Sequence, residues 1–316
     1  MTQYFSDTIE GLRLLLSQVP GLATPTSAPY LFRPFLLLIV LALVIGPVAT
    51  IVNLRRLEFN AEAMVHSVFP GIVAGAIWGG SDRIIPGAAL TAVVVALALT
   101  WASRRPSLAE GGAAVILTGF FSIGIIISLK KGDMSGQLEA LMFGRLLEVT
   151  DSRLLQALLV CLLALILMAA TWKEQLFVAH DRHGAGAAGI NTLLVDVVIN
   201  AAVGAVVVSA STAVGVLLVI GYLVVPGAAA RLLGTTSRAM VVISALVALA
   251  GGWIGVEWMN APAARPVSPQ AAVSLSLLGV FALCLVLSRL LMRFPQMRTG
   301  AAGLGAPSAP RTVDAA

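Results

Sequence analysis

Hydrophobic residues occur along most of this chain in runs that are long enough to cross a lipid bilayer. A hydrocarbon core about 30 Å thick needs about 20 apolar residues in a helix. The runs predict nine spans, or eight full spans and one broken element, and the chain is therefore expected to be an all-α polytopic membrane protein. The predicted spans lie near 31–53, 62–80, 84–102, 112–129, 153–171, 190–210, 213–230, 239–258 and 271–291.

The run at 213–230 is the candidate for the broken element. It contains Pro226 followed by Gly227. Proline lacks the backbone N–H that an interior helical position donates, so a break or kink is expected at Pro226. Such irregular backbone is tolerated at membrane depth only where neighbouring protein covers it.

Composition narrows the class of protein further. The chain is 59% hydrophobic and 11% charged, with a mean hydropathy of +0.97, which excludes a soluble globular domain. Cys161 and Cys284 each lie within an apolar run, which favours buried thiols over a disulfide or a metal site. The net charge of +5 comes without a basic cluster interleaved with aromatic residues, so no nucleic-acid partner is expected.

Basic residues divide unequally between the two sets of loops that the spans define. The richer set is expected to face the cytoplasm, which places the N-terminus outside and the C-terminus inside. Its twelve members are Arg55, Arg56, Arg104, Arg105, Lys173, Arg182, Arg231, Arg238, Arg289, Arg293, Arg298 and Arg311. The other set has eight members, which are Arg13, Arg33, Arg83, Lys130, Lys131, Arg145, Arg153 and Arg265.

The ends of the chain differ from its membrane part. Residues 1–30 carry Asp7 and Glu10 before a short apolar run, which argues against a cleaved signal peptide and for an amphipathic segment at the membrane interface. Residues 31–293 form the predicted transmembrane domain. Residues 294–316 are rich in Ala, Gly and Pro and are predicted to be a disordered cytoplasmic tail.

Three ionisable residues stand out near the second span. Glu58, Glu62 and His66 recur every four residues, so a helix places them on one stripe. An ionised group at mid-bilayer costs roughly 2.5–3.5 kcal/mol on insertion scales, so such groups persist mainly beside a pathway or a partner. Glu62 and His66 are the candidate cation ligands, whereas Glu58 lies nearer to Arg55 and Arg56 and is interpreted as an ion-pair or dimer-contact residue.

Other polar groups have less specific interpretations. Asp196 and Asn200 lie one turn apart near the inner end of their span and are expected to make interhelical hydrogen bonds or to contact the adjacent cytoplasmic loop. His180 and His183 flank Asp181 at a spacing that could hold a metal, although contact with a partner protein is favoured.

The segment 172–190 is amphipathic in its first half and rich in Gly and Ala in its second half. In the predicted topology it is cytoplasmic. A membrane domain driven by a separate ATPase needs a rigid internal segment through which the motor's motion passes by contact. We interpret 172–190 as this coupling segment, and the alternative is an ordinary loop.

The order of these motifs resembles the permease subunits of ABC importers for zinc, manganese and iron. The resemblance covers nearly the whole hydrophobic part of the chain, and its last stretch matches in glycine, proline and arginine positions. Four stretches carry it: LRRLEFNAEAMVHSVFPG (Leu54–Gly71), SLAEGGAAVILTGFFSIG (Ser107–Gly124), LFVAHDRHGAGAAGI (Leu176–Ile190) and VGVLLVIGYLVVPGAAARLL (Val214–Leu233).

The resemblance implies a homodimeric permease in the bacterial inner membrane, with one cytoplasmic ATPase docked on each copy and one external solute-binding protein shared between them. In the family's second helix an Asp and a His meet the passing metal; here His66 is retained and Glu62 replaces the Asp. Contact with the ATPase is carried over to Ala179, His180, Asp181, Arg182 and Gly189. No permanently bound cofactor is expected, because zinc, manganese or iron would pass through only transiently.

The chain has no GxxxxGK[ST] phosphate-binding motif, so an ATP-driven permease needs a partner to hydrolyse the nucleotide. Three alternatives to an ATP-driven metal permease remain at this stage. The chain could be a secondary transporter that uses an ion gradient, a family member that carries a non-metal cargo, or a membrane scaffold that transports nothing. The external loop 259–269 is lengthened relative to the family pattern, which leaves its role open.

Overall fold

The computed structural model describes residues 2–19, 21–105, 108–130, 144, 146–211, 215–260 and 268–293, and these are helical with no strand. The elements are α1 (Thr2–Leu16), α2 (Ala23–Thr26), α3 (Pro29–Leu54), α4 (Glu58–Ser67), α5 (Phe69–Gly79), η1 (Ser81–Arg83), α6 (Ile84–Ser103), α7 (Ala109–Lys130), η2 (Leu146–Glu148), α9 (Asp151–Ala170), α10 (Trp172–His180), α11 (Arg182–Ala187), α12 (Thr192–Ser211), α13 (Val216–Leu233), α14 (Ser237–Asn260) and α15 (Pro269–Arg293).

Eight stretches of the described chain are long and apolar enough to cross a membrane, and α13 is a shorter apolar helix. The prediction of an all-α polytopic membrane protein with about eight or nine spans is therefore confirmed. Of the predicted break or kink at Pro226, the break is wrong, because α13 continues through Pro226 to Leu233, and the kink stays a prediction. The helix packs against α3, α14 and α15, so protein surrounds the position where the proline removes a hydrogen bond.

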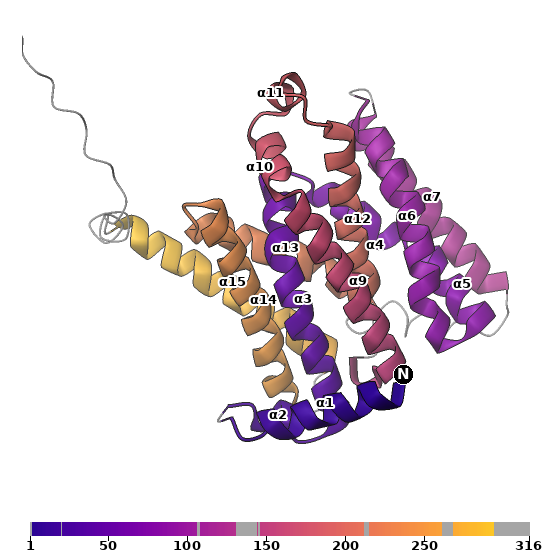
Figure 1. Ribbon diagram of the computed structural model, residues 1–316, viewed down its shortest axis with the longest axis vertical. Coiled ribbons are helices and arrows are strands. Elements are labelled where there is room, and N and C mark those ends of the chain that lie inside the picture. The colour runs from indigo at the N-terminus through magenta and orange to yellow at the C-terminus, as the bar shows by residue number, and fades with distance from the viewer. Residues whose placement is uncertain are drawn as a thin grey trace, which may run out of the picture.

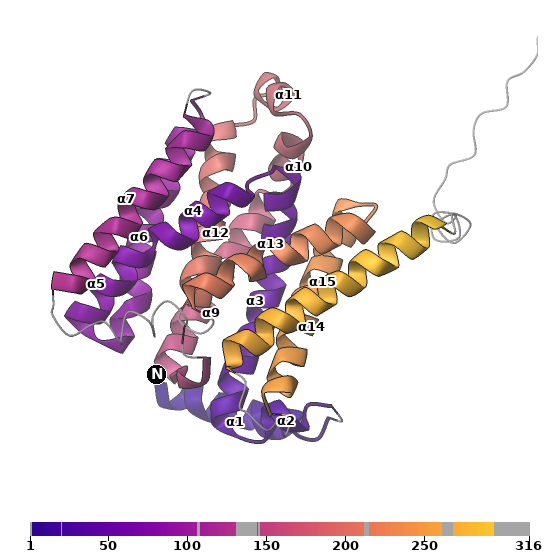
Figure 2. The same ribbon diagram turned by 180° about the vertical axis from the view of Figure 1, so that it is seen from behind.

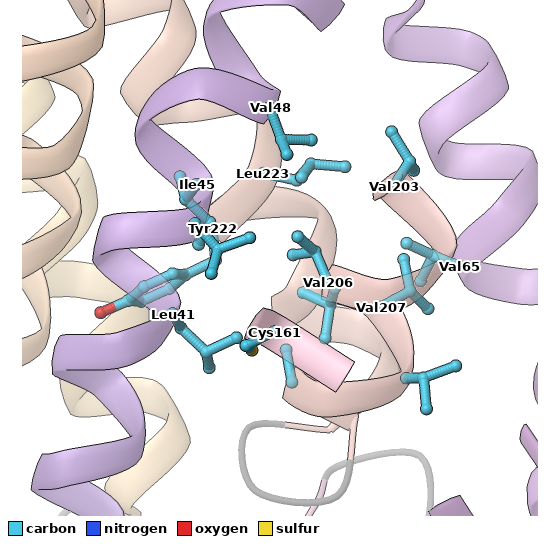
Figure 3. Packing of buried hydrophobic residues seen from close by; sticks show 14 of the residues in the cluster. Leu41, Ile45, Val48, Val65, Cys161, Val203, Val206, Val207, Tyr222 and Leu223 are labelled. Atoms are coloured by element: carbon cyan, nitrogen blue, oxygen red, sulfur yellow. The ribbon is translucent and has the colours of Figure 1, made fainter. Parts of the chain in front are cut away.

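Helix α3 is the centre of the bundle. Figures 1 and 2 show α14 and α15 on one flank of α3, and α5, α6 and α7 on the opposite flank. Apolar side chains of α3, α4, α9, α12 and α13 meet in one core (Figure 3). The Tyr222 hydroxyl, buried among them, donates a hydrogen bond of 2.9 Å to the carbonyl oxygen of Ala248. Cys161 and Cys284 are free and buried, as the sequence predicted.

Glycines allow α5 and α6 to approach each other closely. A Cβ atom built on Gly87 would collide with the carbonyl oxygen of Gly71 and lie 3.1 Å from the Cα of Gly75. Small residues at a helix contact let two backbones come together in a membrane, where no hydrophobic force drives helices into contact. This contact fixes α5, which directly follows α4.

The two ends of the bundle carry different short helices. Figures 1 and 2 show α1 and α2 across one end and α10 and α11 at the opposite end, which we call the α10–α11 end. The predicted orientation would place the α10–α11 end in the cytoplasm, and it stays a prediction. The predicted domain boundaries also stay predictions, and the tail 294–316 lies outside the described residues.

The turn between α3 and α4 contains an unusual backbone conformation. Arg56 has φ +54°, and the amide of Leu57 donates a 2.8 Å hydrogen bond to the carbonyl of Val52. This is the helix-ending motif in which the left-handed position is usually glycine. The Arg56 side chain is exposed.

Replacing Arg56 by glycine is therefore expected to stabilise the fold. A non-glycine residue in the left-handed region is disfavoured by roughly 1–2 kcal/mol, part of which the flexibility of unfolded glycine offsets. We expect Arg56→Gly to raise the free energy of unfolding by about 0.5–1 kcal/mol, measured by denaturation in detergent micelles. Arg289→Gly, on the exposed face of α15, is the control and should lower it by about 1 kcal/mol. Lower stability of Arg56→Gly would contradict this account of the turn.

Candidate functional site

Glu62 and His66 lie one turn apart on α4, where the sequence placed them. The Glu62 side chain is exposed on the single chain and His66 is half-buried. The His66 ring meets the edge of Phe121 from α7, with ring centroids 5.7 Å apart and an interplanar angle of 82°. The pair is thus at the protein surface of one copy and is not sealed inside the core.

Pro70 shapes the backbone directly after the pair. The sequence predicted one span over 62–80, but the structure begins the helix at Glu58 and divides it at Val68 into α4 and α5. Residue 70 would normally donate to the carbonyl of His66, and proline has no N–H to do so. The carbonyl oxygen of His66 therefore lacks its regular helical partner, close to the imidazole of the same residue.

Glu58 has a separate role from the Glu62–His66 pair. Its Oε1 accepts a hydrogen bond of 3.3 Å from Nδ2 of Asn53, at the end of α3. The structure thus ties Glu58 to the α3–α4 turn. The interpretation of Glu58 as a dimer-contact residue stays a prediction.

Within its described residues, one copy of the chain supplies too few side chains for a metal site. Among the described residues there is no group of three or more His, Cys, Asp or Glu side chains that could hold an ion. Glu62 and His66 offer one carboxylate and one imidazole, a mixed oxygen and nitrogen set that suits zinc, manganese or iron. These ions take four or more ligands, so a metal site built on this pair would need further ligands from elsewhere.

The coupling segment predicted at 172–190 forms the two helices α10 and α11. His180, Asp181 and Arg182 are exposed there, and Ala179 is half-buried. The Asp181 carboxylate accepts hydrogen bonds from the amides of His183 and Gly184 at 3.0 and 2.9 Å, which caps α11.

Gly189 ends the second helix of the segment. It has φ +79°, and the following amide, that of Ile190, donates a 3.0 Å hydrogen bond to the carbonyl of Ala185. This is the common helix-ending arrangement that favours glycine. Asp181 and Gly189 thus have structural reasons for their identity, whatever else they contact.

Asp196 is the centre of a charged cluster at the α10–α11 end. Its side chain is 4% exposed and accepts from Arg55, Arg104 and Arg182, which come from three different parts of the chain. Arg182 binds both carboxylate oxygens, at 3.1 and 2.6 Å, and Arg104 Nη1 lies 3.3 Å from Oδ2. We call Asp196 and these three arginines the Asp196 cluster.

Gln175 of α10 joins this cluster from a fully buried position. Its Oε1 accepts from Nη1 of Arg55 at 2.9 Å, and its Nε2 donates to the carbonyl of Val195 at 2.9 Å. Burial lowers the pKa of the Arg55 guanidinium below its ordinary value, and the hydrogen bond to Asp196 acts in the opposite direction. The free-energy cost of burying the Arg55 charge is thus offset by its hydrogen bonds to Asp196 and Gln175.

The prediction that Asp196 and Asn200 make interhelical hydrogen bonds agrees with the structure. Asn200 Nδ2 donates to Oγ1 of Thr100 on α6 at 2.9 Å. Sequence reasoning missed the convergence of arginines on Asp196. The available signal was that Arg55, Arg104 and Arg182 all belong to the richer basic set, on the side where Asp196 was expected.

Comparison with known proteins places this geometry in context. The model of a family described as the ABC 3 transport family matches residues 27–286. The manganese transport system membrane protein MntC of Halalkalibacterium halodurans is 27% identical over 231 residues, which cover 73% of this chain and 78% of that protein. The chelated iron transport system membrane protein YfeC of Yersinia pestis is 32% identical over 181 residues, or 57% of this chain and 60% of that protein.

A solved structure shares the fold. PsaBC from Streptococcus pneumoniae, in complex with Fab, superposes with a TM-score of 0.71 at 21% identity. The match covers 90% of this chain and 95% of the other chain. At this identity the likeness supports the arrangement of the helices.

Proposed function

The chain belongs to the ABC 3 transport family, and on that premise we propose that it is the permease subunit of an ATP-driven importer for a divalent transition-metal ion. The resemblance found in the sequence is thereby confirmed, and the chain is a multi-pass bacterial membrane protein. The cargo proposal is supported by relatives named as manganese and chelated-iron transport membrane proteins. The observation that carries it is the Glu62–His66 pair on one accessible face of α4.

A second copy of the chain completes the metal passage in this proposal. Two copies related by a twofold axis beside α4 would bring two carboxylates and two imidazoles to one ion. That set satisfies a four-coordinate ion with mixed oxygen and nitrogen ligands. Covering the exposed Glu62 would also remove a charged group from lipid, where it is costly.

Glutamate at position 62 bears on which ions fit. Its side chain is one methylene longer than the aspartate of the family motif, so its oxygens reach farther from the helix axis. The hard carboxylate oxygen favours manganese or ferrous iron relative to a site of imidazole or thiolate alone. We propose that manganese, iron and zinc compete for the same pair.

The energy for transport comes from a partner in this proposal. The chain carries no phosphate-binding loop, and its exposed α10–α11 helices offer a docking surface for a cytoplasmic ATPase. An external solute-binding protein would deliver the ion at the opposite end. The permease itself then catalyses no reaction and only alternates its access to the two sides.

The test is metal uptake into proteoliposomes that hold the permease with its ATPase and solute-binding protein. We expect ATP-dependent accumulation of radioactive manganese or iron, with mutual competition among manganese, iron and zinc. Uptake that needs an ion gradient and no ATPase would contradict the proposal. Failure of all three metals to accumulate or compete while ATP is hydrolysed would refute the assigned cargo.

A further inference from the structure

We propose that Asp196 is the positioning residue that joins the coupling segment to the metal-bearing helix. Through its arginine partners it would fix α10 and α11 to the turn that leads into α4, so that a displacement of the segment reaches Glu62 and His66. This inference rests on the proposed function, since it takes the α10–α11 helices as the surface that an ATPase moves.

The coupling segment is attached to α12, near the start of that helix, at two neighbouring points. Arg182, at the start of α11, makes a two-pronged contact with the Asp196 carboxylate. Gln175 of α10 is bonded to the carbonyl of Val195. A guanidinium that binds both oxygens of a carboxylate fixes orientation as well as distance. The segment and α12 therefore move together.

The same carboxylate holds the turn before α4. Arg55 follows the last residue of α3, its side chain is 6% exposed, and it donates to both Asp196 and Gln175. Helix α4 begins three residues later at Glu58, and Glu62 lies one turn farther along it. The path from the coupling segment to the proposed metal ligands thus runs through the Arg182–Asp196 and Asp196–Arg55 ion pairs, across the α3–α4 turn, and along the first two turns of α4.

The α3–α4 turn is also restrained from the other side. Nη1 of Arg231, in the last turn of α13, lies 3.3 Å from the carbonyl oxygen of Asn53. The Asn53 side chain in turn donates to Glu58 at the start of α4. A turn that is held on both sides transmits a displacement instead of absorbing it by local bending. Coupling between sites needs such a contiguous, packed connection.

The charges make Asp196 the critical member of the cluster. Three guanidinium groups meet one carboxylate, so two positive charges are left in excess. Arg104 and Arg182 are 38% and 44% exposed and are solvated in part, but Arg55 is not. Removing the carboxylate leaves Arg55 as a buried charge beside two like charges, which is unfavourable. Loss of Asp196 should therefore free Arg182 and leave Arg55 bonded to Gln175 alone, which weakens the connection between the coupling segment and the α3–α4 turn.

The experiment uses the full complex of permease, ATPase and solute-binding protein in proteoliposomes. One readout is the number of metal ions imported per ATP hydrolysed. The second is independent of the cargo: a spin label on Phe59→Cys, an exposed position of α4, reports whether ATP changes its environment. The matched control is Asp151→Asn, because Asp151 is another carboxylate paired with an arginine, accepting from Arg33 at 2.9 Å.

We expect Asp196→Asn to lower metal imported per ATP by at least about tenfold and to reduce the ATP-dependent change at the label, whereas Asp151→Asn changes neither. Asp196→Glu should restore most of both readouts. Arg182→Gln is the second variant, for the case in which Asp196→Asn does not assemble. It alters a half-exposed residue and keeps the Arg55–Asp196 pair, and it should weaken both readouts.

Two results would overturn the inference: wild-type readouts in Asp196→Asn, or wild-type readouts in Arg182→Gln where Asp196→Asn does not assemble. The label separates this inference from the cargo assignment. If the wild type responds to ATP at position 59 yet imports no manganese, iron or zinc, the cargo is wrong, and the label response in the variants still decides the role of Asp196.

Discussion

A permease carrying His66→Ala is expected to lose metal uptake by a factor on the order of 100. Removing groups that only orient a metal ligand already lowers affinity or activity by about 10–100-fold, so loss of a ligand itself should reach at least the upper part of that range. In a dimer the substitution removes two imidazoles at once. Glu62→Gln keeps the size of the side chain but loses the charge, and it should reduce uptake by at least about tenfold.

The measurement is the initial rate of radioactive manganese uptake in assembled proteoliposomes. Glu257→Gln is the control, because it makes the same chemical change in α14, away from α4. It should leave uptake unchanged. Uptake at the wild-type rate in His66→Ala, with normal assembly, would remove His66 from the passage.

Gly87→Val should prevent the permease from folding to normal yield. The added atoms would meet the backbone of Gly71 and Gly75 on α5, and a backbone cannot rotate out of the way as a side chain can. Overpacking a well-packed contact costs typically 1–3 kcal/mol, and we expect at least the upper end of this range here. A loss of this size is a large fraction of the free energy of unfolding of an ordinary protein.

Gly279→Val in α15 is the matched control, since nothing lies within 4 Å of a Cβ atom built at Gly279. Monodisperse protein recovered in detergent and its thermal unfolding temperature are the measurements. A yield and unfolding temperature of Gly87→Val equal to those of Gly279→Val would show that α5 and α6 do not pack as described.

The transmembrane helices were predictable because a span needs a long apolar run, and the runs are visible without any tertiary information. The pair Glu62 and His66 was predictable for a similar reason, since four-residue spacing fixes a shared helix face. The effect of Pro226 was not predictable in the same way. Whether a proline ends a helix depends on the helices packed around it, and α13 continues because it has such neighbours.

The Asp196 cluster shows the limit of local reasoning more clearly. Arg55 and Asp196 are 141 positions apart, and Arg104 and Asp196 are 92 positions apart. Periodicity relates residues within one helix and says nothing about which helix ends lie together. Loop charge placed all these groups at one end of the bundle, but only the packing of α3, α6 and α12 brings them into contact.

The central claim, that the cargo passes between Glu62 and His66, is tested most directly by electron–nuclear double resonance on Mn²⁺ bound to the permease complex. The chain has three histidines, His66, His180 and His183, so each can be removed separately. We predict a nitrogen coupling from an imidazole that persists in the double variant His180→Ala/His183→Ala and disappears in His66→Ala. A bound ion whose nitrogen coupling is unchanged in His66→Ala would contradict the account.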